Sequence, residues 1–163
     1  MSVVVRPALP DDLGRVGALT AHAYLADDLL AHDDDYLHEL RDAARRADEA
    51  TVLVAVEGDH VLGSITLAAP GSPFAEIAAP DEWELRMLAV DPAARGRGVG
   101  ELLLRAAIES GLADGASAVI LSTLPAMAAA QRMYARIGLH RVPSRDWSVE
   151  GYSMLVYSTA PPP

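Results

Sequence analysis

One short segment, residues 85–114, constrains the fold more than any other part of the chain. A strand-like apolar run from Leu85 to Val90 stops at Asp91-Pro92, and a glycine-rich turn leads directly into a helix predicted over residues 99–114. A strand, a glycine turn and a helix N-terminus together can form an anion site, because backbone N–H groups approach a phosphate closely and the helix dipole favours negative charge. The segment therefore predicts an α/β protein that binds a phosphate-bearing ligand.

The spacing within the turn excludes two common phosphate loops. The loop of the nucleoside triphosphatases needs Gly-Lys-Ser/Thr, and this chain contains no lysine. The dinucleotide fingerprint needs Gly-x-Gly-x-x-Gly, whereas Gly96, Gly98 and Gly100 alternate with other residues. Arg95 and Arg97 can add positive charge beside an anion. A glycine-rich turn that binds no ligand is the alternative.

The pattern Arg95-x-x-Gly98-x-Gly100, preceded by Val90-Asp91-Pro92, resembles the acetyl-coenzyme A loop of the GNAT superfamily of N-acetyltransferases. The resemblance implies acetyl-CoA as cosubstrate, no metal, and a pyrophosphate held by the whole loop: Arg95, Gly96, Arg97, Gly98, Val99 and Gly100. It also implies that the fourth and fifth strands separate after a bulge in the fourth. The pantetheine arm would then pair with the backbone of Leu88, Ala89 and Val90.

Apolar patterning along the rest of the chain predicts one domain over residues 1–159, with residues 160–163 as a disordered tail. Strands are expected at 3–7, 51–57, 61–67, 83–90, 118–122, 139–142 and 154–158, with 143–152 as a link. Helices are expected from residue 10, over 37–47, over 99–114 and over 125–137. In the second helix, the apolar face comprises Leu37, Leu40, Ala44 and Ala47. The order matches the α/β GNAT fold, a mixed central sheet of about seven strands with four helices on both faces and splayed fourth and fifth strands.

Tyr134 is the candidate acid. Residues 130–139 resemble the family's Ala-x-x-Leu-Tyr-x-x-x-Gly-Phe, with Leu139 in place of the phenylalanine. The resemblance implies that this tyrosine lies near the coenzyme sulfur and donates a proton to the departing thiolate. The helical spacing of Met127, Ala130, Tyr134 and Ile137 also turns the tyrosine inward. A core tyrosine with its hydroxyl bonded to backbone is the alternative. Met127 stands where family members often have asparagine.

Glu84 is the candidate base, because some family members carry a glutamate at this point of the fourth strand that deprotonates the amine through water. The alternative is a solvent-facing carboxylate in the acidic run 81–84. Glu76, or no dedicated base, also fits. A strand N–H near Leu88 or Ala89 is expected to stabilise the oxyanion. Arg86 is expected to pair with a neighbouring carboxylate.

Composition limits the partners. A net charge of −10 argues against nucleic acid, and no apolar run is long enough to span a membrane. The chain has no cysteine, which excludes disulfides and a thiol nucleophile and is compatible with the cytoplasm. The five histidines lack metal-ligand spacing. The GNAT resemblance implies that two loops border the acceptor site, and the matching segments here carry many carboxylates: Asp27, Asp28, Asp33, Asp34, Asp35, Glu76, Asp81, Glu82 and Glu84. This clustered charge suggests a cationic amine, and charge that serves only solubility is the alternative.

Together these features predict an acetyl-CoA-dependent N-acetyltransferase of bacterial type. It would move an acetyl group to a primary amine, on a small molecule or a peptide N-terminus, by direct attack in a ternary complex. A non-catalytic acyl-CoA-binding or sensing domain, and a transferase of a longer acyl group, are the alternatives. The sequence is compatible with a homodimer.

Overall fold

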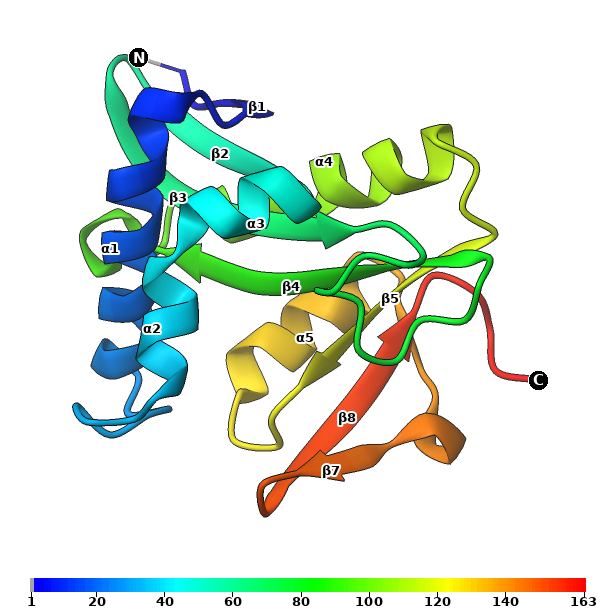
Figure 1. Cartoon of the computed structure of the whole chain (residues 1–163). Helices are drawn as coiled ribbons and strands as arrows, with labels where there is room; N and C mark the ends of the chain where they lie inside the picture. Colours follow the sequence, from blue (N-terminus) through cyan, green and yellow to red (C-terminus); the bar gives the residue numbers. More distant parts are fainter. Residues whose placement is uncertain (1) are drawn as a thin grey trace.

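A computed structural model describes residues 2–163, and a mixed sheet forms its centre (Figure 1). The strand order is β1-β2-β3-β4-β5-β8-β6, with β7 paired to β8 outside this path. Only β4 and β5 pair in parallel. The strands are β1 (Val4–Pro7), β2 (Thr51–Glu57), β3 (His60–Ala68), β4 (Glu82–Val90), β5 (Ala118–Thr123), β6 (His140–Arg141), β7 (Trp147–Val149) and β8 (Tyr152–Ser158).

Helices cover both faces of the sheet, as the sequence predicts. They are α1 (Leu13–Ala26), α2 (Tyr36–Arg41), α3 (Ala43–Glu49), α4 (Val99–Ala113) and α5 (Ala128–Arg136). Strand β2 shows how alternation divides the core, because successive side chains point to opposite faces. Val52 and Val54 pack with α1 and α3, whereas Leu53 and Ala55 pack in the core that contains α4 and Tyr134 of α5.

The second predicted helix is in fact two helices, so residues 2–163 contain five α-helices rather than four. Asp42 leaves the helical conformation at φ −87° and ψ 65°, and its carboxylate accepts the N–H of Arg45 at 3.2 Å. An aspartate that caps a new first turn in this way interrupts a longer helix. The break rotates the following turn, so Ala43 and Arg46 are buried and Ala44 is exposed, contrary to the predicted apolar face.

Two smaller differences concern the C-terminal third. The predicted link over residues 143–152 contains β7, which forms a hairpin with β8. The last helix begins at Ala128 rather than Pro125, and Gly138 follows it with φ +97°. Both differences leave the order of the main elements unchanged.

Strand β4 carries the expected bulge. Ser64 of β3 pairs with Ala89 and Thr66 pairs with Arg86, so one β3 residue lies opposite both Met87 and Leu88. Two residues against one is the definition of a β-bulge. Met87 has φ +56°, in the left-handed region that non-glycine residues rarely adopt. As a result Arg86 and Met87 break the alternation, and Met87 packs toward α1 and α2 while Leu88 packs toward α4.

Strands β4 and β5 separate close to this bulge. Their parallel pairing runs only over Glu82–Leu85 and Ala118–Leu121. Beyond it, Ser122 and Thr123 of β5 pair with β8, and the two arrows diverge in Figure 1. Residues 86–90 of β4 therefore pair with β3 on one side and with no strand on the other, as far as residues 2–163 describe the sheet. The predicted splay is confirmed.

Two glycines of α1 test how closely α1 and α2 pack. A Cβ on Gly17 would lie 2.1 Å from the carbonyl oxygen of Arg41, whereas a Cβ on Gly14 would meet nothing within 4 Å. We expect Gly17→Ala to lower the free energy of unfolding by about 1–3 kcal/mol, because α2 must move. Gly14→Ala should raise it by about 0.5–1 kcal/mol, through helix propensity alone. Urea unfolding of both variants measures this, and equal effects would contradict the close packing.

Candidate active site

The loop between β4 and α4 has the backbone of an anion site. Gly96 and Gly98 have φ of +80° and +77°, and a Cβ on either would meet no atom within 4 Å. Glycine is therefore required here by the left-handed backbone and not by crowding. Gly98 is the N-cap of α4 and offers no side-chain hydrogen bond to the helix. The N–H groups of the first turn of α4 thus lack acceptors within the helix and can bind an anion.

The two arginines of this loop are paired with carboxylates from other elements. Arg95 binds Asp27, which follows α1, at 2.5 and 3.0 Å. Arg97 binds Glu57, at the end of β2, and this ion pair lowers the pKa of the Glu57 carboxyl. Exposed ion pairs of this kind contribute little stability because water and salt screen them. Phosphate oxygens can therefore replace either carboxylate without a large cost.

The open edge of β4 leads directly into this loop. The N–H of Asp91 donates to the carbonyl oxygen of Leu62 in β3 at 2.8 Å. Because hydrogen-bonded and non-hydrogen-bonded positions alternate along an antiparallel pair, Ala89 also directs its backbone groups to β3. Leu88 and Val90 direct theirs to the side that β5 has left. Of the three residues predicted to bind the pantetheine arm, these two have the suitable orientation.

Tyr134 lies on the inner face of α5, as the helical spacing predicts. It is 5% exposed, and its ring centroid lies 5.3 Å from that of Tyr157. Burial raises the pKa of the Tyr134 phenol to about 12, and the neighbouring Thr123 side chain has a smaller effect that lowers it. Thr123 belongs to the part of β5 that pairs only with β8. The phenol is therefore directed toward the divergence of β4 and β5 and stays protonated at neutral pH.

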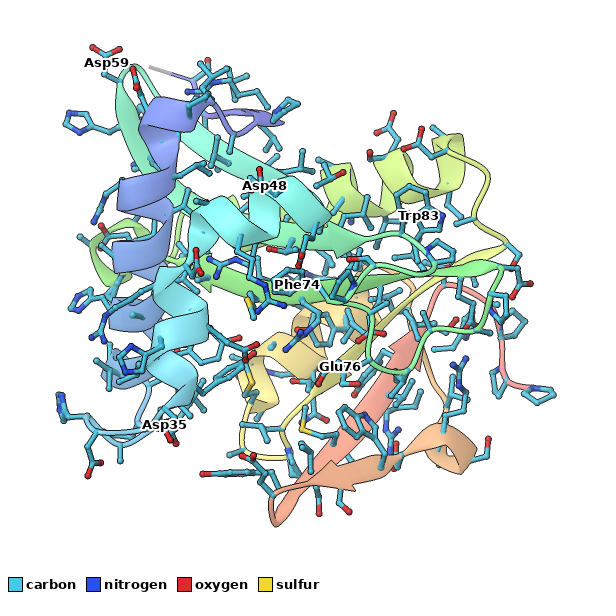
Figure 2. All side chains as sticks on the ribbon, viewed as in Figure 1. Asp35, Asp48, Asp59, Phe74, Glu76 and Trp83 are labelled. Carbon is cyan, nitrogen blue, oxygen red and sulfur yellow. The ribbon has the colours of Figure 1, made fainter. Side chains whose placement is uncertain are left out.

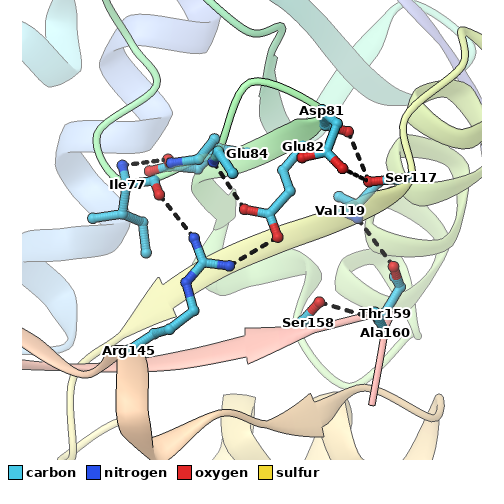
Figure 3. Close-up of polar contacts among 12 residues, drawn as sticks. Ile77, Asp81, Glu82, Glu84, Ser117, Val119, Arg145, Ser158, Thr159 and Ala160 are labelled. Carbon is cyan, nitrogen blue, oxygen red and sulfur yellow. Dashed lines mark hydrogen bonds and ion pairs between the residues drawn. The ribbon is translucent and has the colours of Figure 1, made fainter. Parts of the chain in front are cut away.

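Glu84 is buried, so the solvent-facing alternative is wrong. It is 1% exposed, and its Oε1 accepts the N–H groups of Glu76, Ile77 and Ala78 at 2.9, 2.8 and 3.0 Å (Figure 3). Burial raises the pKa of the Glu84 carboxyl, although these three hydrogen bonds act in the opposite direction. The carboxylate fastens the loop between β3 and β4 to the sheet. Its role as a base stays a prediction.

Arg145 also fixes this loop, through contacts with Ile77 and Glu82. The Arg145 guanidinium donates to the carbonyl oxygen of Ile77 at 2.9 Å and to the Glu82 carboxylate at 2.8 Å (Figure 3). Glu82 also accepts the N–H of Ala79 at 2.9 Å. Loop residues 76–79 are thus fixed by two carboxylates of β4 and one arginine.

Arg86 pairs with a carboxylate, as the sequence predicts. Its Nε lies 3.1 Å from Oε1 of Glu76, and its Nη2 donates to the hydroxyl of Tyr36 at 2.8 Å. Glu76 lies on the loop that crosses in front of β4 (Figure 2). The rings of Tyr24 and Tyr36 meet edge to face, with centroids 6.4 Å apart. Sequence reasoning missed both tyrosines, because they flank an irregular acidic loop without periodicity.

Gln131 is a second residue that the sequence did not reveal. Its side-chain amide donates to the carbonyl oxygens of Leu124 and Pro125 at 3.3 and 3.1 Å, and it accepts the hydroxyl of Tyr157 at 3.1 Å. These bonds fix the connection between β5 and α5, and with it the position of Tyr134. Met127, where the family often has asparagine, instead accepts a weak hydrogen bond from Thr123 at 3.5 Å.

Most carboxylates expected to face the acceptor are engaged within the protein. Asp27, Glu76 and Glu82 form ion pairs, and Asp81 accepts the Ser117 hydroxyl at 2.7 Å. Glu84 is buried, as described above. The exposed members of the set are Asp27, Asp28, Asp33, Asp35, Glu76 and Asp81, of which Asp27, Glu76 and Asp81 are engaged as just described. The acidic loops therefore offer an acceptor less uncompensated negative charge than the sequence suggests.

Residues 2–163 contain neither a cluster of metal ligands nor a membrane-spanning helix. No group of three or more His, Asp or Glu side chains there is arranged to hold a metal ion. No helix in that range has the length and apolar character needed to cross a bilayer.

Comparison with known proteins decides the family. The family model of the acetyltransferase (GNAT) family matches residues 19–139. The chain belongs to this family. The glycine loop, the splayed strands and Tyr134 all lie within the matched region.

Solved structures of this family share the fold. An acetyltransferase from Corynebacterium glutamicum, described as histone acetyltransferase HPA2 and related acetyltransferase, is 22% identical, with a TM-score of 0.75 over 100% of this chain and 98% of that one. The Salmonella typhimurium protein yncA, solved with acetyl-CoA, is 20% identical, with a TM-score of 0.72 over 97% and 93%. A PaiA N-acetyltransferase from Thermoplasma acidophilum, solved with coenzyme A, is 16% identical, with a TM-score of 0.70 over 96% and 98%.

One curated relative matches part of the chain. The N-acetylaspartate synthetase of Danio rerio is 36% identical over 69 residues. The match covers 42% of this chain and 24% of that protein, so the chain spans well under two thirds of its relative.

Two glycines at opposite ends of α4 test the anion site. Gly98 and Gly115 both have positive φ, +77° and +98°, and open space around the position of a Cβ. An alanine at either should cost about 1–2 kcal/mol of stability, because the left-handed backbone disfavours a Cβ. We expect only Gly98→Ala to weaken coenzyme A binding as well, by roughly 5- to 30-fold if the loop relaxes by that amount. Calorimetric titration measures it, and equal affinities of the two variants would place the coenzyme elsewhere.

Proposed function

We propose that this chain transfers an acetyl group from acetyl-CoA to a primary amine, on a small molecule or a peptide N-terminus, by direct attack in a ternary complex. One observation carries the proposal. The uncapped N-terminus of α4 follows, after the loop over residues 91–98, on the stretch of β4 that has a neighbouring strand on one side only. A pyrophosphate site and an open strand edge in continuous sequence suit a long nucleotide thioester better than a compact phosphate ligand.

The residues present fit coenzyme A along this path. The backbone N–H groups of the loop and the side chains of Arg95 and Arg97 would hold the pyrophosphate. The backbone of Leu88 and Val90 would bind the pantetheine amides as a strand neighbour does. Acetyl-CoA supplies the acetyl group as a thioester.

The protein's own groups can meet the three needs of the transfer. The amine must lose a proton before it attacks, and Glu84, whose pKa burial raises, would accept that proton through water. The N–H of Leu88 would stabilise the oxyanion. Tyr134 would donate its proton to the sulfur as the carbon–sulfur bond breaks. The new amide nitrogen would then lose its surplus proton, which would return to the Tyr134 phenolate through water. The absence of cysteine supports direct attack over a thiol acyl-enzyme.

The acceptor is proposed only as a class. A cationic amine is supported by the exposed Asp28, Asp33 and Asp35, and opposed by the internal pairing of most other carboxylates. The Danio rerio relative is named for an acetylated amino acid, aspartate. That name adds amino acids to the amines that should be tested, although the match covers only a quarter of the relative.

Tyr134→Phe and Tyr157→Phe form a matched pair, since each deletes one hydroxyl from two buried rings in contact. Thiol release from acetyl-CoA over a panel of amines measures turnover. We expect Tyr134→Phe to lower kcat by roughly 10²-fold, because the sulfur loses its proton donor. Tyr157→Phe should stay within a few-fold of the unmodified enzyme, and both variants should bind acetyl-CoA normally.

Two results would contradict the proposal. Tight binding of acetyl-CoA without thiol release on any amine would favour a binding or sensing domain. A covalent acetyl group on the enzyme, detected by mass spectrometry after incubation with acetyl-CoA alone, would exclude direct attack.

Glu84→Gln and Glu82→Gln separate a base from an anchor. Both carboxylates accept loop N–H groups, and a glutamine can retain that acceptor at either position. Because a base works only when deprotonated, we expect kcat/KM to rise with pH through the raised pKa of Glu84. In Glu84→Gln, the rise of kcat/KM with pH should disappear and kcat should fall about 10²-fold. In Glu82→Gln, both the pH dependence and kcat should stay as in the unmodified enzyme. A full pH profile of each variant measures this. Unchanged activity of a folded Glu84→Gln protein would reduce Glu84 to a structural role.

A further inference from the structure

Two arginines lie on the face of the sheet that α1, α2 and α3 cover, Arg46 buried and Arg86 largely buried, and neither belongs to the chemistry described above. Arg46 of α3 is 1% exposed, and its Nη1 donates to the carbonyl oxygen of Glu39 at 2.6 Å. Its Nε has no hydrogen-bond partner, and no carboxylate of residues 2–163 lies within 4 Å of its guanidinium. Burial lowers the pKa of this guanidinium, because a positive charge removed from water without a full set of partners is destabilised.

Arg46, Arg86, Tyr24 and Tyr36 form one cluster, here called the arginine–tyrosine cluster. The Tyr24 and Tyr36 rings are in contact, with centroids 6.4 Å apart, and Tyr24, Tyr36 and Arg86 all influence the pKa of Arg46. Tyr36 accepts a hydrogen bond from Arg86. Arg86 lies on β4 two residues from Glu84, the candidate base, and two residues from Leu88, whose N–H is the proposed oxyanion donor. The cluster is therefore beside the reaction centre.

The carboxylate now bound to Arg86 is replaceable. The Glu76 side chain is 36% exposed, whereas that of Arg86 is 13% exposed. Glu76 belongs to the loop between β3 and β4, and only its backbone N–H is fixed, by Glu84. A planar guanidinium binds any carboxylate in the same way. Glu76 thus occupies the place that the carboxylate of a small ligand would take, and the cluster opens to solvent at this point.

We propose that the acceptor is a small amino acid whose carboxylate replaces Glu76 on Arg86 and is stabilised further by Arg46 and the two tyrosine hydroxyls. The proposal rests on the acetyltransferase function above and specifies its substrate class. Arg86 and Glu84 are two residues apart on one strand, which separates their Cα atoms by about 6.6 Å. A carboxylate on Arg86 therefore leaves an amine one to four carbons away within reach of Glu84.

Three pairs of amines test the proposal: glycine, β-alanine and γ-aminobutyrate, each against its own amide. Each pair keeps the amine and removes the negative charge. We measure kcat/KM for thiol release, corrected for the fraction of neutral amine, and the Kd of each amine for enzyme saturated with coenzyme A. Amino acids should be preferred by about 10-fold or more, as expected for a carboxylate bound to a buried arginine.

Three variants assign the effect to the cluster. Arg86→Gln should raise the Kd of the amino acids about 30-fold and leave that of the amides unchanged. Glu76→Gln should lower the Kd of the amino acids by about threefold, because it removes the competing carboxylate. A gain in affinity cannot result from misfolding. Arg105→Gln, on the exposed face of α4, is the matched control and should change neither Kd.

The outcomes distinguish this proposal from the function on which it rests. If amides, diamines or peptides are acetylated as well as amino acids, and Arg86→Gln affects all amines equally, the amino acid proposal is wrong and the acetyltransferase function stands. If Glu76→Gln weakens amino acid binding, Glu76 is no competitor and the proposal also fails. If no amine is acetylated and coenzyme A does not bind, the function itself is wrong.

Discussion

Beyond Leu85, β4 has a hydrogen-bonded neighbour on one side only, and the candidate site is built around this one-sided stretch. The bulge at Met87 and Leu88 ends the regular alternation, and β5 turns away to pair with β8. Unpaired strand edges are normally covered or kept short, because their backbone groups seek partners. Here the edge is retained between a helix N-terminus and a buried phenol, which indicates that a ligand completes it.

The glycine loop and the open edge depend on each other through chain continuity. Strand β4 ends at Val90, and the loop places the first turn of α4 only a few residues later. The loop has no side-chain cap for α4 and contains two glycines in the left-handed conformation. Both features lower its local stability, and the missing cap leaves backbone N–H groups accessible. Proteins tolerate such local conflicts where they serve binding. The carboxylates of Asp27 and Glu57 neutralise the positive charge of Arg95 and Arg97. We propose that phosphate oxygens replace these carboxylates when a ligand binds.

The charged side chains on and near β4 form contacts within the protein, unlike the backbone groups of the open edge. Glu84 and Glu82 bind the backbone of the loop between β3 and β4. Of the two arginines near this loop, Arg86 pairs with the exposed carboxylate of Glu76, and Arg46 has no carboxylate partner among the described residues. Burying a guanidinium whose Nε has no hydrogen-bond partner lowers the stability of the folded protein. We therefore interpret Arg46 as part of the proposed binding site. The sign of the net charge, −10, thus says little about the charge that an acceptor meets.

The sequence by itself determined the order of strands and helices, the glycine loop at the start of α4 and the inward direction of Tyr134. These depend on spacing within a few residues, which periodicity and backbone preferences fix locally. Tertiary structure alone decided that Arg46 is buried, that Glu84 receives three loop N–H groups, and that Glu76 pairs with Arg86. Those outcomes join residues from separate elements, and a carboxylate has the same local pattern whether it faces water, an amide or an arginine.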